Sequence, residues 1–235
     1  MATLRAYLLI DPLIVLTTVV MGALSMLVSF FDRSGNTPHR VARAYGRMVL
    51  WVCGMRVRVE GLENIPRQGG CVIAPNHLSF TDTPLLMAHI PLQFRFLAKK
   101  GLFRVPFIGD HLRRAGHIAI PREDARGSLK AMSASARIVK ERGVSVLVFP
   151  EGGRSHGELQ EFKEGAAYIA VKAGVPIIPV AIRGTREVLP MGSLVVRPGK
   201  VVLRIGAPMP TAGLTLQDRT RLTTELRAKI LALMA

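Results

Sequence analysis

The feature that most constrains this chain is an uncharged run from Pro12 to Phe31. Wound as an α-helix, its 20 residues would measure about 30 Å, the thickness of the hydrocarbon core of a bilayer. No small-residue cleavage site with a polar shoulder follows the run, so we expect an uncleaved membrane anchor rather than a signal peptide. Gly22 and Ser25 interrupt the apolar run and lower its hydrophobicity. A full span and a helix that enters one leaflet obliquely therefore both stay open.

A second N-terminal helix is expected from Thr37 to about Cys53. Arg40, Arg43 and Arg47 fall on one side of it, while apolar residues line another. Such a helix can lie on anionic lipid, or it can pack on the rest of the protein with its arginines in water. Basic residues crowd the C-terminal side of the apolar run, and by the positive-inside tendency this predicts that the following chain is cytoplasmic.

Composition narrows the classes of partner. The 32 Lys and Arg residues against 16 Asp and Glu give a formal charge of +16, which favours a polyanionic partner. Hydrophobic residues make up 49% of the chain, and there is no basic region with interleaved aromatic residues. We therefore expect an anionic bilayer surface as partner, and no nucleic acid. The two cysteines, Cys53 and Cys71, imply no disulfide framework and fit no metal-site spacing, so we expect buried thiols and no metal.

The remaining chain alternates strand-like and helix-like segments, which predicts an α/β fold with a mixed, largely parallel central sheet flanked by helices. The run from Val144 to Phe149 is apolar throughout, as in a strand buried on both faces of a parallel sheet. In the apolar run from Val175 to Ile182, Pro176 and Pro179 indicate an edge strand. The other expected strands are 56–60, 70–74, 94–98, 116–120 and 201–205, and the expected helices are 124–142, which ends at Gly143, and a C-terminal helix opened by Thr215 and Asp218.

The junction between the 70–74 strand and the next helix carries His77 and Asp82. The helix can begin with Ser79 as its cap and Asp82 three residues on, or with Thr83 as its cap and Pro84 in its first turn. Both starts leave His77 outside the helix, so the carboxylate can fold back to a ring nitrogen. The pair is either an ordinary polar cap or a general base with its orienting partner, in which one ring nitrogen is fixed and the other is free to take a proton.

Three later stretches end apolar segments with basic or small residues: 116–122, 149–155 and 175–180. Ligands of α/β sheets collect beyond the carboxyl ends of the strands. Arg122, Arg154 and the Gly152–Gly153 turn there predict a phosphate pocket, with guanidinium forks and bare backbone N–H groups as donors. Glu151 can tether one arginine or hold a substrate hydroxyl. The sequence contains no P-loop, no Gly-x-Ser-x-Gly elbow and no zinc spacing, which disfavours a nucleotide hydrolase, a serine hydrolase and a metalloenzyme.

In this order, the four stretches closely resemble the glycerolipid acyltransferase family, and within it the 1-acyl-sn-glycerol-3-phosphate acyltransferases. Gly153 departs from the pattern, because the family has Thr there. Ala98-Lys99 and Phe162 to Gly165 also look like family positions. The matching blocks are Asn76, His77 and Asp82 for Asn-His-x-x-x-x-Asp; Gly116 to Arg122 for Gly-x-Ile/Phe-x-Ile-x-Arg; Phe149 to Ser155 for Phe-Pro-Glu-Gly-Thr-Arg-Ser; and Val175 to Val180.

The resemblance implies transfer of a fatty acyl group from acyl-CoA or acyl carrier protein to lysophosphatidate, without a cofactor. It assigns His77 as the base and Asp82 as its partner, and we expect backbone N–H groups near the helix start to hold the oxyanion. Substrate-binding roles fall to Arg122, Glu151, Gly152, Arg154 and Lys99.

The expected organisation is a membrane-anchoring part over residues 1–54 and a catalytic domain over residues 55–235. Two other functions stay open. One is a related acyltransferase that uses glycerol 3-phosphate or a lyso-aminolipid as acceptor, and the other is a non-catalytic protein that binds lipid at the membrane surface.

Overall fold

The computed structural model describes residues 2–32, 34–155 and 157–235. In these residues seven strands form one sheet in the order β1-β7-β6-β2-β5-β3-β4. Every neighbouring pair is parallel except β6 and β7, which are antiparallel. The expected mixed, largely parallel sheet is confirmed. The strands are β1 Met55–Glu60, β2 Val72–Pro75, β3 Phe94–Lys99, β4 Ile118–Ile120, β5 Ser145–Leu147, β6 Ile177–Arg183 and β7 Gly199–Ile205.

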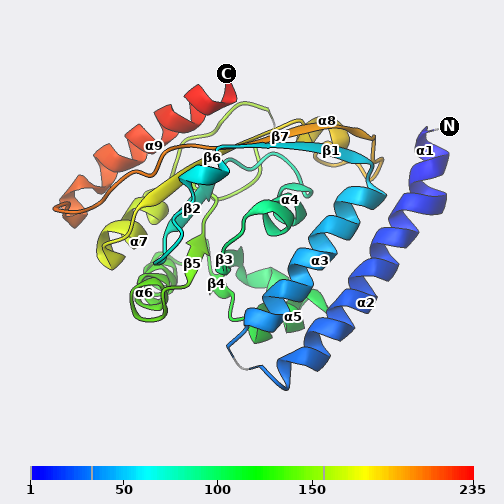
Figure 1. Ribbon diagram of the computed structural model, residues 1–235, viewed down its shortest axis with the longest axis horizontal. Helices are drawn as coiled ribbons and strands as arrows, with labels where there is room; N and C mark the ends of the chain where they lie inside the picture. The colour runs from blue at the N-terminus through cyan, green and yellow to red at the C-terminus, as the bar shows by residue number, and fades with distance from the viewer. Residues whose placement is uncertain (1, 33, 156) are drawn as a thin grey trace.

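Helices cover both faces of the sheet, and this explains the continuous apolar runs of its central strands. In β2 and β5, Val72 and Val146 face one apolar cluster while Ile73 and Leu147 face the other. The first cluster is closed by α6 Ala125–Arg142, α7 Gly165–Ala173 and α9 Arg219–Met234, and the second by α3 Asn36–Val52 and α4 Asp82–His89 (Figure 1).

Helix ends follow the expected signals in two places. Helix α6 ends at Gly143, whose left-handed backbone at φ 62° suits a residue without a Cβ atom. Thr215 and Asp218 form the expected capping box, although a 3₁₀ turn stands between this box and α9. The shorter elements are η2 Leu62–Asn64, η3 Lys100–Arg104, α5 Ile108–Arg114, α8 Thr185–Val188 and the 3₁₀ turn η4 Leu216–Asp218.

The expected edge position of the strand that contains Pro179 is wrong. Strand β6 lies inside the sheet, between β2 and β7. Pro179 is tolerated there because the chain after β7 meets it through its carbonyl alone, which accepts a hydrogen bond of 2.8 Å from Gly206 N. The next strand residue, Val180, is where the antiparallel ladder with β7 begins.

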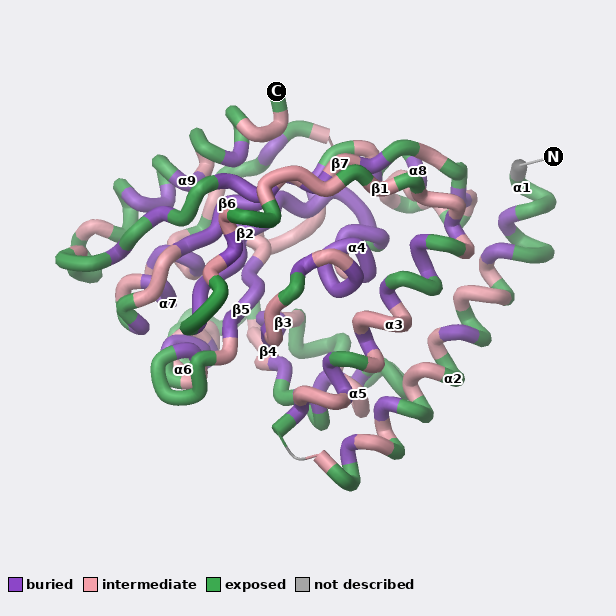
Figure 2. The backbone as a smooth tube through the Cα atoms, in the orientation of Figure 1, coloured by how far each residue is buried: buried purple, intermediate pink, exposed green. Residues whose placement is uncertain are grey.

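The N-terminal run forms one long helix. It comprises α1 Ala2–Arg5, a π-helical turn η1 Ala6–Ile10 and α2 Asp11–Ser29. By length and composition Thr3–Ser29 could cross a membrane, and only 17% of its most apolar window is buried. The chain then turns back into α3, which runs beside α2 (Figure 1). Exposed stretches recur along the whole of α2 (Figure 2), so much of the apolar surface of this helix is not covered by the rest of the described chain.

Candidate functional site

The site begins where β2 ends, and Asn76 fixes that end. Its side-chain amide donates to Ile182 O at 3.0 Å, and its side-chain oxygen accepts from Ile182 N at 2.7 Å. Asn76 thereby continues the pairing of β2 with β6 by one residue, using a side chain in place of backbone. This holds the following residue, His77, at the carboxyl edge of the sheet, where ligands collect in α/β proteins.

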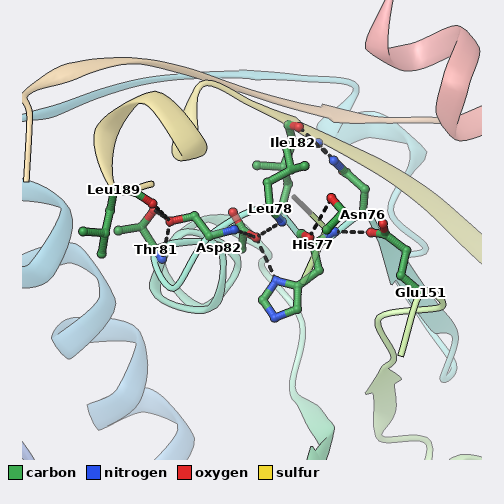
Figure 3. Close-up of polar contacts among 10 residues, drawn as sticks. Asn76, His77, Leu78, Thr81, Asp82, Glu151, Ile182 and Leu189 are labelled. Atoms are coloured by element: carbon green, nitrogen blue, oxygen red, sulfur yellow. Dashed lines mark hydrogen bonds and ion pairs between the residues drawn. The ribbon is translucent and has the colours of Figure 1, made fainter. Parts of the chain in front are cut away.

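His77 and Asp82 make the contact expected from their spacing. His77 Nδ1 lies 2.8 Å from Asp82 Oδ2, and both residues are buried (Figure 3). The same Asp82 oxygen accepts from Leu78 N at 2.7 Å and from Ser79 N at 2.8 Å. Three donors therefore converge on one oxygen and fix the Asp82 side chain between the loop and the start of α4. Because Asp82 Oδ2 accepts a hydrogen bond from the ring, the ring hydrogen is on Nδ1, and Nε2 is left as the basic nitrogen.

The start of α4 differs from both expected starts. The helix begins at Asp82 itself, and its N-cap residue, Thr81, makes no side-chain capping hydrogen bond. Half of the expected capping box is present, because Asp82 accepts from Ser79 N at 2.8 Å. The Ser79 hydroxyl accepts from Thr81 N at 3.3 Å, rather than from Asp82 N, and donates to Leu189 O at 2.8 Å. The expectation that N–H groups here serve an oxyanion is not met at Leu78 and Ser79, whose N–H groups are taken by Asp82.

The backbone of His77 is held from a second direction by the loop after β5. His77 N donates to Glu151 Oε1 at 2.6 Å, and His77 O accepts from Ser155 N at 2.8 Å. The other Glu151 oxygen accepts from Gln160 N at 3.0 Å. Glu151 is therefore a positioning residue in this structure. Among the described residues Glu151 makes no hydrogen bond to Arg122 or Arg154, so the expected tether to an arginine is not formed there.

The His77 ring sits in an apolar setting. It stacks on Phe149, with ring centroids 3.8 Å apart and planes at 16°. Burial lowers the pKa of His77, while the hydrogen bond and charge of Asp82 oppose the shift, and Arg154 and Arg122 add to it. The lowered pKa keeps His77 neutral at neutral pH, which is the form that can accept a proton.

Cations stand beside the ring. Arg154 lies over the Phe80 ring at 3.7 Å, and its Nε is buried without a hydrogen-bond partner among the described residues. Burial lowers the pKa of both Arg154 and Arg122. Lys99 is exposed, and among the described residues its one ion pair is a long contact of 3.7 Å with Glu123. The region can thus accept an anion.

The two glycines of the 152–153 turn differ. Gly152 has φ +72°, and the Lys163 side chain lies against it, so that a Cβ there would approach Lys163 Cε to 2.9 Å. At Gly153 a Cβ would meet only Arg122 Nη1, at 3.9 Å. The chain therefore requires glycine at the first position and leaves open space beside Arg122 at the second, where the family has Thr.

A cavity of about 480 Å³ adjoins the His77–Asp82 pair. Its polar part includes His77, Arg122 and Arg154, together with Lys99. The rest is mostly apolar and is built by side chains from α2, α3, α4, β3 and α5, among them Ile14, Met21, Val49, Met87 and Leu112. The N-terminal helices thus form one wall of the same cavity that holds His77.

Residues 56–183, more than half of the chain, match the family model described as Acyltransferase. The chain belongs to this acyltransferase family. The resemblance drawn from the four sequence blocks is confirmed, and the match begins in β1 and ends with the last residue of β6.

Named relatives agree with this assignment. The acyltransferase described here is 35% identical over 169 residues to the chloroplastic 1-acyl-sn-glycerol-3-phosphate acyltransferase BAT2 of Brassica napus, which covers 71% of this chain and 48% of the relative. It is 32% identical over 184 residues to the human 1-acyl-sn-glycerol-3-phosphate acyltransferase alpha, which covers 78% of this chain and 65% of the relative. Across the curated relatives compared, the chain spans 43% to 65% of their length.

A solved structure resembles the whole chain. The 1-acyl-sn-glycerophosphate acyltransferase PlsC of Thermotoga maritima is 28% identical, with a TM-score of 0.81, and the match covers 100% of this chain and 98% of that one. The likeness therefore includes the N-terminal helices, which the family model does not reach.

Sequence reasoning missed three contributors to the candidate site around His77. Phe149 and Ser155 were within a recognised block but had no assigned role, although an aromatic residue directly before the Pro-Glu-Gly turn could have suggested a ring stacked on the histidine. Phe80, which carries Arg154, gave no signal, because no local pattern pairs an aromatic residue with an arginine 74 positions away.

Proposed function

We propose that this acyltransferase transfers a fatty acyl group from an acyl thioester, acyl-CoA or acyl carrier protein, to the 2-hydroxyl of 1-acyl-glycerol 3-phosphate and so forms phosphatidic acid. The observation that carries the proposal is the buried His77–Asp82 pair at the polar end of an otherwise apolar cavity, beside two arginines. The relatives named above bear this activity in their names.

The chemistry follows from the free ring nitrogen. Nε2 of His77 removes the hydroxyl proton while the alcohol oxygen attacks the thioester carbonyl. The C–S bond then breaks, the ester is released, and the thiolate takes the proton back from the imidazolium. Asp82 holds the ring and stabilises the imidazolium between the two steps. No acyl-enzyme forms in this series of steps, and His77 returns to its neutral form at the end.

The two substrates would occupy different parts of the cavity. The phosphate of the acceptor would bind Arg154 and Arg122, with Lys99 beside them; the unpartnered Arg154 Nε supports this, since a buried donor needs an acceptor. The acyl chain of the donor would lie among the apolar walls. The 2.6 Å bond from His77 N to Glu151 keeps the base fixed between the two parts.

We further propose that the enzyme associates with one leaflet, with the catalytic part on the cytoplasmic side. Helix α2 packs along α3 and α5. A full span would draw Arg40 and Arg47, which are exposed on α3, into hydrocarbon, and this is unfavourable. The basic residues after α2 favour the cytoplasmic side.

Release of free thiol tests the proposal. The full chain, reconstituted in vesicles, is given acyl-CoA or acyl carrier protein thioester, with lysophosphatidate, glycerol 3-phosphate or a lyso-aminolipid as acceptor. We expect thiol release only with lysophosphatidate, and a fall of about 10²–10⁴-fold in His77→Ala with folding intact. Faster turnover of another acceptor would reassign the substrate, and no acceptor-dependent release would leave a lipid-binding protein.

A further inference from the structure

A second exposed apolar surface lies outside the N-terminal helices, in the catalytic part of the chain. It belongs to the segment from Leu102 to Ile108, which runs from the last residues of η3 to the first residue of α5 and is called the 102–108 segment. Leu102, Val105, Phe107 and Ile108 are each between 37% and 42% exposed. Four large apolar side chains exposed within seven residues form a patch of the kind that marks an interaction site.

The 102–108 segment contacts α2 through Phe107, and α5 continues these contacts along α2. Helix α5, which follows it, runs beside the C-terminal half of α2 (Figure 1). The contacts advance along both helices in the same direction and about one turn at a time. They are the close approach of Phe107 to Gly22, a 2.6 Å hydrogen bond between His111 Nδ1 and Ser25 Oγ, and a 3.2 Å hydrogen bond from Arg114 Nη1 to Ser29 Oγ.

The contact between the segment and α2 depends on Gly22, which has no side chain, and on Phe107, whose backbone is strained. Phe107 has φ +61°, unfavourable for a residue with a Cβ atom and maintained only where the surroundings impose it. A Cβ on Gly22 would lie 2.9 Å from Phe107 Cβ. The absence of a side chain at Gly22 therefore lets the segment approach α2, and the strain at Phe107 is part of that approach.

The chemistry around the segment matches an anionic lipid surface. On α2 the exposed apolar residue Val19 lies three residues before Gly22 and about 60° from it round the helix, and the exposed Phe30, directly after α2, lies under Arg114 of α5, so apolar surface of the N-terminal helix stands beside the segment and α5. Lys100, just before the segment, and Arg104, within it, are both exposed. Neither is among the ion pairs of the described residues. Apolar side chains flanked by unpaired cations are the composition of an interfacial element that inserts among acidic headgroups.

We propose that the 102–108 segment is a second lipid-inserting element, which enters the same anionic leaflet as α2. The proposal rests on the membrane association proposed above. Leu102, Phe107 and Ile108 also line the cavity. Insertion of the segment thus places one wall of the acyl cavity at the level of the lipid chains, next to the bilayer from which a lipid substrate comes.

An environment-sensitive fluorophore on single cysteines tests the insertion directly. The full chain carries Val105→Cys in the segment, Leu16→Cys on the exposed side of α2, or Leu129→Cys on α6, where the side chain is 48% exposed. Cys53 and Cys71 are buried, and burial raises the pKa of each thiol to about 11, so the unsubstituted chain should take up little label and serves as the blank. The vesicles contain phosphatidylcholine and phosphatidylglycerol in equal amounts, with a nitroxide quencher on the lipid chains.

We expect quenching at position 105 as strong as at position 16, and little at position 129. Quenching at 16 without quenching at 105 would overturn this inference and leave the membrane association standing. Absence of quenching at both positions would overturn both. An emission change at 105 that requires added acyl carrier protein, or that rises with protein concentration, would assign the surface to a protein partner and also overturn the inference.

A charge substitution gives a functional readout. Val105 is outside the cavity lining, so Val105→Glu should leave turnover of a short-chain, water-soluble lysophosphatidate unchanged. With lysophosphatidate embedded in vesicles we expect turnover to fall about tenfold, because the carboxylate must enter a negatively charged interface. Leu129→Glu, matched in charge and exposure, should lower neither rate. Equal rates for Val105→Glu on both substrates would contradict the proposed insertion.

Discussion

Substitution of Asp82 by Asn separates the charge of this residue from its geometry. Asp82 Oδ2 receives all three donors, from His77, Leu78 and Ser79, while Oδ1 is buried without a hydrogen-bond partner among the described residues. In Asp82→Asn the amide oxygen can take the place of Oδ2 and accept the same three hydrogen bonds. The tautomer of His77 is then preserved, and only the negative charge is removed.

The distance sets the magnitude. With 2.8 Å between Nδ1 and Oδ2 and an effective dielectric constant of about 20, a full imidazolium and carboxylate attract by about 6 kcal/mol. If about half of the positive charge has developed in the transition state, the loss is about 3 kcal/mol, or about 10²-fold in rate. The amide NH₂ would occupy the unpartnered position of Oδ1 and lower the free energy of unfolding by about 1–3 kcal/mol.

The measurement is the pH profile of kcat in vesicles, together with the thermal unfolding midpoint. Because Asp82 raises the pKa of His77 against the effect of burial, Asp82→Asn should lower that pKa further. The acid limb of the profile should therefore move to lower pH while the plateau falls. Glu63→Gln, which removes one exposed carboxylate on η2, is the matched control and should change neither. An unchanged plateau, or an acid limb that moves to higher pH, would refute the general-base pair.

Three further predictions follow from the site and the core. Arg154→Gln should raise KM for lysophosphatidate by about 10-fold or more with a smaller effect on kcat, because it removes a charge-assisted hydrogen bond to the phosphate; a fall in kcat alone would instead place Arg154 at the transition state. Gly152→Ala should lower the free energy of unfolding by about 1–2 kcal/mol because of its φ of +72°, whereas Gly153→Ala, with 3.9 Å of clearance, should be nearly neutral, and chemical denaturation of both in micelles compares them. Burial lowers the pKa of His39 to about 3 and of His111 to about 4. Below pH 6.5 the unfolded chain therefore binds protons at these histidines that the folded chain does not. The free energy of unfolding should then fall by about 2 kcal/mol per histidine between pH 7 and pH 5. A denaturation midpoint that is constant between pH 7 and pH 5 would contradict this.

Local signals in the sequence determined much of the fold. Helix α6 ends at Gly143 because a glycine can take the left-handed conformation there, and the capping box at Thr215 forms because both partners lie within one turn. The apolar run that contains β5 indicated a strand buried on both faces, and β5 has that position. The contact of His77 with Asp82 could also be expected, since five residues of a loop followed by a helix start can bring the two together.

The sequence predicted an edge position for β6 and a substrate-binding role for Glu151, whereas the tertiary structure puts β6 inside the sheet and hydrogen-bonds Glu151 to the backbone of His77. Pro179 lies within the sheet because the partner on that side needs only its carbonyl, a fact about another segment of the chain. Glu151 holds the backbone of His77, 74 residues away, rather than an arginine. Phe80 and Phe149 take their places beside Arg154 and His77 for the same reason. Propensities, caps and hydrophobic periodicity depend on neighbours along the chain, so the sequence reports them directly. Which distant donors and rings meet at one point depends on how whole elements pack, and only the folded chain decides that.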